Sequence, residues 1–175
     1  MAVGTKKSNI ITNLDLAKPV IADVGKEVGT VYVSCDAFEV AAEDVGDVND
    51  VIELTRLPSH ARPLSILIFS DELDTNASPT LATDCGIYLT DGTVKDADAF
   101  GSAVTTGWGD AAGAGVEFIT EAGAAAVANI GKRLWEWVGE SSDPSVDYDI
   151  CLRLTAVAAT GAAGTLSFII KYTLD

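Results

Sequence analysis

Alternating apolar and polar residues predict that this chain is built mainly from β-strands. The clearest case lies in Val48–Leu73, where Ile52 and Leu54 alternate with polar residues up to a corner at Leu57–Pro63. A proline lies near each end of this corner. Because proline has a fixed φ and no backbone N–H, the corner should end one strand and begin another. We therefore expect two strands joined by a tight bend to organise the rest of the fold.

The strand after the corner, Leu64–Phe69, is apolar on both faces. One face begins with Leu64 and continues at every second residue, and the other holds Leu67 and Phe69. A strand of this kind is usually covered on both sides. This strand could be covered in two ways. We favour cover by a helix predicted at Asn129–Val138, and the alternative is that a partner subunit covers the face of Leu67 and Phe69.

The same alternation predicts further strands along the chain. The last two should form an antiparallel hairpin through the loop Ala156–Gly164, and Asp91–Gly92 should form a tight turn. The predicted strands are Thr30–Val40, Leu81–Thr90, Val116–Thr120, Tyr148–Thr155 and Thr165–Leu174.

Two segments have helical features. Asp96–Ala103 is predicted to form a short helical turn with an aspartate as its N-terminal cap. Asn129–Val138 places Ile130, Leu134 and Trp137 on one face of a 3.6-residue period, and Gly139 supplies a left-handed residue beyond its end. With these elements, the chain is expected to be mainly β, as an antiparallel, jelly-roll-like β-sandwich with one or two short helices. We predict an extended N-terminal arm over residues 1–20 and a single sandwich domain over residues 21–175.

Composition narrows the possible partners. The 175 residues carry 11 basic and 26 acidic side chains, for a net charge of −15. Direct nucleic-acid binding needs a concentrated basic surface, so it is not expected. No apolar run approaches the roughly 20 residues of a membrane helix, and the N-terminus lacks the apolar core of a secretory signal.

Candidate chemistry is sparse. His60 is the only histidine and no known nucleophile motif accompanies it, so we expect no enzyme and no catalytic residue. Cys35, Cys85 and Cys151 contain no C-x-x-C pair and are expected to be buried free thiols. No cofactor or metal is expected. A calcium ion at Asp91–Asp98 is a weaker alternative, because Lys95 occupies a ligand position.

The residues expected to contact a partner are of two kinds. Trp135 and a tryptophan in a glycine-rich loop suit a protein interface, or less well a sugar ring. Basic and apolar residues of the arm suit ordering on a neighbouring molecule. The full set is Lys6, Lys7, Ile10, Ile11, Leu14, Leu16, Trp108 and Trp135.

Several stretches together resemble the head decoration or cement proteins of tailed bacteriophages. The two most specific are the corner containing Leu57, Pro58, Ala61 and Arg62, and the block from Gly131 to Asp149. The other matching stretches are TKKSNIITNLDL, GTVYVSCDAFEVAAED, TDCGIYLTDGTVKDADAFGSAV and AAGTLSFIIKY. This chain departs from the family pattern at an acidic insert, Glu43–Asp50, and a glycine- and alanine-rich loop, Gly107–Gly115.

The resemblance implies a virion structural role and supplies no catalytic residue. The expected partners are the major capsid protein and further copies of this chain, in a virion assembled in the host cytoplasm. Two alternatives remain open, a tail or neck component and a glycan-binding sandwich.

Overall fold

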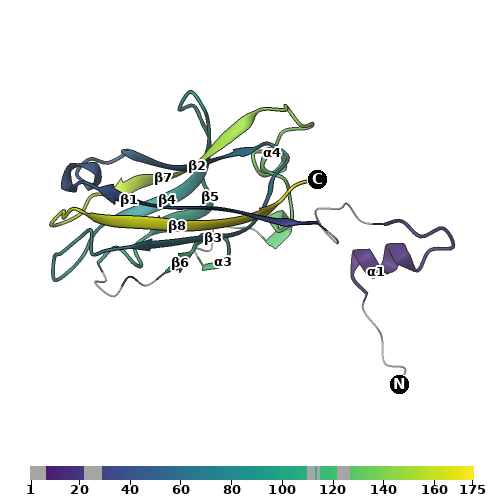
Figure 1. Cartoon of the computed structure of the whole chain (residues 1–175), viewed down its shortest axis with the longest axis horizontal. Helices are drawn as coiled ribbons and strands as arrows, with labels where there is room; N and C mark the ends of the chain where they lie inside the picture. The colour runs from purple at the N-terminus through teal and green to yellow at the C-terminus, as the bar shows by residue number, and fades with distance from the viewer. Residues whose placement is uncertain (1–6, 22–28, 110–112, 114, 122–126) are drawn as a thin grey trace, which may run out of the picture.

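The computed structural model contains two four-stranded antiparallel sheets packed face to face (Figure 1). It describes residues 7–21, 29–109, 113, 115–121 and 127–175. Sheet A has the strand order β1 (Val31–Val40), β8 (Gly164–Thr173), β3 (Arg62–Ser70) and β6 (Val116–Glu117). Sheet B has the order β2 (Val51–Pro58), β7 (Asp147–Ala156), β4 (Ala82–Leu89) and β5 (Val94–Val104). This is an eight-stranded jelly roll, so the predicted fold class is confirmed.

The helices are short and lie outside the sheets. In the described part of the chain, the α-helices are α1 (Asn9–Leu14), α3 (Phe118–Glu121) and α4 (Leu134–Trp137), and the 3-10 helices are η1 (Ala42–Val45) and η2 (Val127–Asn129). In Figure 1, α1 lies apart from the sandwich.

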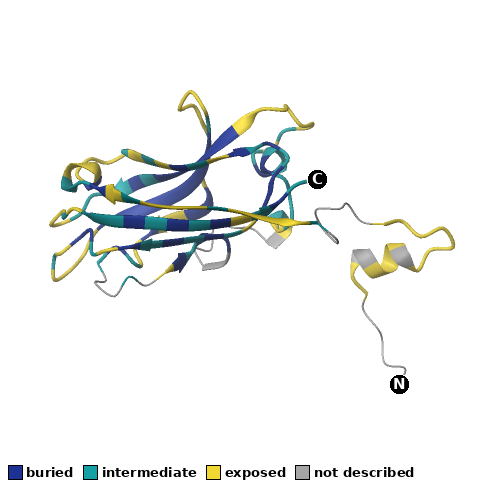
Figure 2. Cartoon of the chain, viewed as in Figure 1, coloured by how far each residue is buried: buried dark blue, intermediate teal, exposed yellow. Residues whose placement is uncertain are grey.

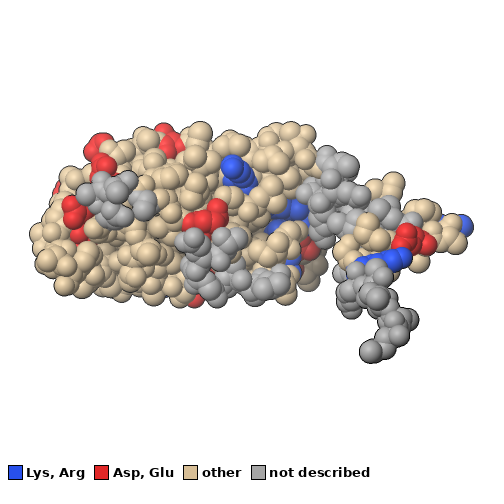
Figure 3. Space-filling model, turned by 90° about the horizontal axis from the view of Figure 1, so that it is seen from below, with Lys and Arg blue, Asp and Glu red and all other residues tan. Residues whose placement is uncertain are grey.

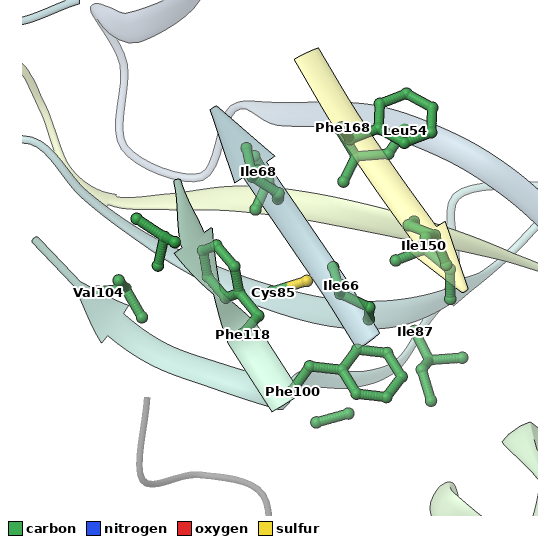
Figure 4. Packing of buried hydrophobic residues seen from close by; sticks show 14 of the residues in the cluster. Leu54, Ile66, Ile68, Cys85, Ile87, Phe100, Val104, Phe118, Ile150 and Phe168 are labelled. Carbon is green, nitrogen blue, oxygen red and sulfur yellow. The ribbon is translucent and has the colours of Figure 1, made fainter. Parts of the chain in front are cut away.

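The core fills the space between the two sheets. Ile66, Ile68 and Phe168 project from sheet A toward Cys85 and Ile150 of sheet B, and each is no more than 3% exposed (Figure 4). In Figure 2 the buried positions follow the middle of both sheets. Burying a large apolar side chain stabilises a fold by about 1.5–3 kcal/mol, so this interface supplies much of the driving force for folding.

The corner at Leu57–Pro63 carries the chain from sheet B to sheet A. Ala61 N–H donates to the Pro58 carbonyl at 2.9 Å, which closes the bend. The two strands predicted around it are confirmed, but the prediction that Leu64 shares a covered face with Ile66 and Ile68 is wrong. The ladder with β8 skips this residue in a bulge, and its side chain is 44% exposed.

The hairpin predicted for the last two strands is wrong. β7 pairs with β2 and β4 in sheet B, whereas β8 pairs with β1 and β3 in sheet A. Alternation looks the same in either arrangement, because both put every second residue into the core. The loop between them is tied instead to the β3–β4 loop, where Asp74 forms an isolated bridge with Gly161. Asp74 also accepts backbone N–H groups of Ala159 and Thr160.

The helical turn predicted at Asp96–Ala103 is also wrong, because these residues belong to β5. β5 arches closely over Gly86 of β4. A Cβ at Gly86 would lie 2.3 Å from the carbonyl oxygens of Asp96 and Ala97. The glycine therefore permits a strand-on-strand approach that local sequence does not reveal.

The helix predicted at Asn129–Val138 is reduced to the four residues of α4. Gly131 has φ +77° and Arg133 is extended, so the helical period is broken before Leu134, and Ile130 is 58% exposed. Gly139 does adopt the predicted left-handed conformation, with φ +77°.

The favoured helical cover of the Leu67 and Phe69 face is not observed. The α4 helix lies instead at the β2–β3 corner, where Leu134 N–H donates to the Ala61 carbonyl. Phe69 packs closely against Gly115, whose added Cβ would lie 2.5 Å from the ring.

Candidate partner-binding surface

The N-terminal arm carries a short helix that is held by its own residues. Ser8 caps α1 by accepting the Ile11 N–H at 3.3 Å, and Lys7 pairs with Asp15 at 2.6 Å. Val20 N–H donates back to the Asn13 carbonyl at 3.1 Å. The expected extended arm therefore includes one helical segment. Within residues 7–21, every hydrogen bond that the structure describes stays inside the arm.

Apolar side chains of the arm are exposed. Ile11 is 46% exposed, Leu16 49% and Ile21 75%. Of the other residues expected here, Lys6 lies outside the described residues. Ile10 and Leu14 lie in α1, and their side chains are not described. Exposed apolar side chains on a segment without a core of its own are typical of a surface that a partner covers.

Charge is distributed unequally between the arm and the sandwich. Residues 1–20 contain three lysines and one aspartate, whereas residues 21–175 contain eight basic and 25 acidic residues. On the face drawn in Figure 3, the basic side chains of the sandwich lie in the half nearer the arm. The basic arm and the acidic sandwich thus suit different partner surfaces.

The edge strand β1 exposes a second apolar surface. Val31 is 52% exposed and Val33 55%, and the next two residues of this face, Cys35 and Ala37, are also exposed. The prediction that Cys35 is buried is therefore wrong. β1 lies at the edge of sheet A, so these side chains are flanked by a neighbouring strand, β8, on one side only.

The other two thiols are buried, as predicted. Cys85 is 0% exposed and Cys151 is 1% exposed. Burial raises the pKa of Cys85 well above its ordinary value and raises the pKa of Cys151 to about 12. Both side chains therefore act as small apolar core residues.

The tryptophans do not form the expected exposed pair. Trp108 is only 2% exposed, and its indole N–H donates to the Val104 carbonyl at 2.9 Å. The predicted exposure of Trp108 is therefore wrong, because its ring belongs to the core. Trp135 is half-buried, with the Arg133 guanidinium 6.0 Å from its ring centre.

A groove of about 380 Å³ lies between β1 and β2 and has an acidic lining that includes Glu39, Asp44, Asp50 and Glu53. Two of these carboxylates already accept hydrogen bonds from this chain. Asp44 accepts the Ala41 N–H at 2.9 Å, and Glu39 accepts the Thr165 hydroxyl at 2.8 Å. Part of the acidic insert therefore shapes the fold as well as the surface.

The corner residues do not form a catalytic arrangement. Ser59 is fully buried and its hydroxyl donates directly to Asp143, so His60 is not placed between them as a general base. That hydrogen bond, followed by one from Ser145 N–H, lowers the pKa of Asp143. Among the described residues there is no group of three or more metal-binding side chains and no helix able to span a membrane.

The two sequence stretches that most resemble phage decoration proteins contact each other. Leu134 N–H donates to Ala61 at 2.9 Å, and Trp135 N–H donates to Ser59 at 3.1 Å. Arg62 is 1% exposed, donates to Gly131 O and forms two bonds to the Asp175 carboxylate, at 2.9 and 2.7 Å. These motifs therefore stabilise one end of the sandwich.

Comparison with solved structures finds the same fold in chains from two phage capsids. A chain of the cyanophage Pam1 capsid asymmetric unit matches with a TM-score of 0.57 and 20% identity, over 92% of this chain and 97% of the other. A chain of the capsid of Ralstonia phage GP4 matches with a TM-score of 0.59 and 24% identity, over 85% of this chain and 88% of the other. No protein-family model and no curated protein matches this sequence.

Proposed function

We propose that this chain is a structural protein of a tailed-phage virion that decorates or cements the head by binding the major capsid protein. The observation that carries the proposal is the fold likeness to chains from two phage capsids. The likeness covers 97% and 88% of those chains, so each is little more than one domain of this kind. The sequence resemblance to decoration proteins points in the same direction.

Attachment through the arm fits its physical properties. Its apolar side chains, Ile11 and Leu16 among them, are about half exposed, and its described hydrogen bonds do not involve the sandwich. Covering apolar surface at a capsid junction stabilises the complex by about 25 cal/mol per Å², and many identical junctions repeat this gain around a shell. The lysines of the arm add attraction to an acidic partner surface.

Copy number tests the proposal directly. We expect purified virions to contain this protein in a fixed ratio to the major capsid protein, measured by quantitative mass spectrometry. One to a dozen copies in each particle would instead indicate a tail or neck component, and its absence would overturn a virion role.

Deleting residues 1–20 tests the role of the arm. Attachment to capsids lacking this protein should fall at least tenfold, while the melting temperature should change by less than about 2 °C, because the described arm adds nothing to the core. A matched pair of substitutions separates the arm from a general charge effect. Leu16→Asp should weaken attachment, and Val94→Asp, at a comparably exposed site on β5, should not. Equal loss of attachment in both variants would contradict the role of the arm.

The glycan-binding alternative has less support. It relied on two exposed tryptophans, and the burial of Trp108 leaves only the half-buried Trp135. Binding to a glycan array that is abolished by Trp135→Ala would revive this alternative.

A further inference from the structure

We propose that β1 is a self-pairing edge, through which two copies of this chain join their A sheets antiparallel about a two-fold axis. The inference rests on the edge of the sheet and is independent of the virion role. It would give a continuous sheet of eight strands, since each sheet A has four.

Three of the four sheet edges carry features that discourage strand addition. β2 has a bulge at Leu54 and ends at Pro58. β5 has several register shifts and carries charged residues, Lys95 and Asp96, directly after its first residue. β6 has only two residues. Bulges, prolines, charges and short length are the usual means by which proteins protect a sheet edge.

β1 has neither a bulge nor a proline. Its two charged residues, Asp36 and Glu39, lie in its second half, and Asp36 accepts the Ala37 N–H at 2.8 Å. Its ten residues pair with β8 in one unbroken register from Val31 to Val40, and they include no proline, lysine or arginine. Within the part of the chain that the structure describes, its backbone makes no backbone hydrogen bond outside sheet A. Apart from the Ala37 N–H, which Asp36 accepts, a long and regular edge of this kind presents backbone N–H and C=O groups to another strand.

The side chains of β1 favour a second copy as that strand. Residues 21–175 have an excess of 17 acidic over basic residues, so two sandwiches repel each other over most of their surface. The first half of β1, from Val31 to Cys35, has no charged residue and exposes apolar side chains. In an antiparallel pair centred on Cys35, this uncharged half faces the half of the other copy that carries Asp36 and Glu39, so no two carboxylates lie directly opposite each other.

The register follows from the faces and the charges. In an antiparallel pair that continues the sheet, facing residues must lie on the same face, so their numbers differ by an even amount. Centring the pair on Asp36 would place two carboxylates directly opposite each other, which is destabilising. Centring it on Cys35 pairs Val33 with Ala37 and Ser34 with Asp36, uses nearly the whole strand, and puts the two Cys35 residues opposite each other.

The native thiols provide the first test. Facing residues in antiparallel strands have Cα atoms about 4.5–5.5 Å apart, within the range of a disulfide. Mild oxidation of the full-length protein should therefore produce a Cys35–Cys35 dimer. Cys35→Ser should abolish this disulfide-linked dimer. The control is the double variant Cys35→Ser with Val94→Cys, which places an exposed thiol on β5 instead. It should form at most one tenth as much disulfide-linked dimer as wild type.

Sedimentation of the reduced protein provides the second test. Wild type should be a concentration-dependent dimer, and Val33→Lys should raise the dissociation constant at least tenfold. Val94→Lys, at a similarly exposed site on another edge, should leave it unchanged. Circular dichroism of both variants verifies folding, and if Val33→Lys does not fold, the Cys35 disulfide alone decides. A wild-type monomer, a trimer, or a dimer that forms no Cys35 disulfide would overturn self-pairing.

Discussion

Replacing Asp74 by asparagine should remove about 3 kcal/mol from the free energy of unfolding at pH 7. This carboxylate is 0% exposed and joins the two loops that carry the chain between the sheets, β3–β4 and β7–β8. An amide offers one acceptor oxygen and turns an N–H₂ group toward backbone donors that it cannot satisfy. An unsatisfied buried donor costs about 1–3 kcal/mol, and hydrogen bonds to a charged group are worth about 1.5–3 kcal/mol. The carboxylate accepts backbone N–H groups at 2.7–3.3 Å from Asn76, Thr80, Leu81, Ala159 and Thr160.

The same carboxylate should contribute to the stability of the protein in a pH-dependent way. Burial by itself raises the pKa of Asp74, but backbone hydrogen bonds from Thr160, Ala159, Thr80 and Leu81 outweigh it and hold the pKa at about 2. Because the folded pKa lies below the unfolded value of 3.8, the stabilisation is present above pH 3.8 and is lost as the pH falls through 2. The difference between the two pKa values corresponds to about 2 kcal/mol.

Urea unfolding of wild type and Asp74→Asn at several pH values tests both effects. The difference in unfolding free energy should be about 3 kcal/mol at pH 7 and should shrink between pH 4 and pH 2. Asp91→Asn is the matched control, because Asp91 is exposed and accepts the Thr93 N–H at 2.9 Å in a surface turn. It should cost less than about 1 kcal/mol. A loss below 1 kcal/mol in Asp74→Asn, or a difference that does not change between pH 4 and pH 2, would refute the reasoning.

Three further predictions concern the rest of the sandwich. Arg62→Lys should lower the unfolding free energy by about 2–3 kcal/mol, because lysine keeps the charge but cannot form the bidentate hydrogen bonds of Arg62 to the Asp175 carboxylate. Unchanged urea unfolding would contradict this prediction. Gly86→Ala should lower the unfolding free energy by about 3 kcal/mol in the same assay, because the added Cβ would lie 2.3 Å from carbonyl oxygens of β5. A decrease below 1 kcal/mol would show that β5 can move away. In the folded protein only Cys35 should react rapidly with a thiol reagent, because burial raises the pKa of Cys151 to about 12, and a second fast thiol before unfolding would be inconsistent with this core.

Most strands could be predicted from the sequence because their core-facing residues recur at every second position. The two most regular cases, β7 and β8, match the predicted segments within about one residue at each end. Their pairing could not be predicted, since alternation marks the buried face and does not say which sheet a strand joins. The jelly roll is decided by contacts far apart in sequence, such as the bridge of Asp74 to Gly161.

The errors in the predicted surface have a similar cause. Trp108 lies in a stretch rich in small residues, a pattern typical of exposed loops, yet the neighbouring sheets enclose its ring and Val104 accepts its N–H. Cys35 lies in an apolar alternation, yet β1 is an edge strand and this side faces outward. In both cases exposure depends on the neighbours of the element in space, which a local pattern does not contain.

The chain enters and leaves the sandwich at the same end, which decides where a second protein can be attached if this chain coats a particle. Val31 pairs with Thr173, so the arm and the C-terminus are adjacent, while Val40 and Gly164 meet at the opposite end (Figure 1). If the arm is the anchor, a protein fused to the C-terminus would be crowded against the shell. A peptide inserted at the exposed residues Asp47 and Val48, between η1 and β2, would instead be displayed on the outer surface.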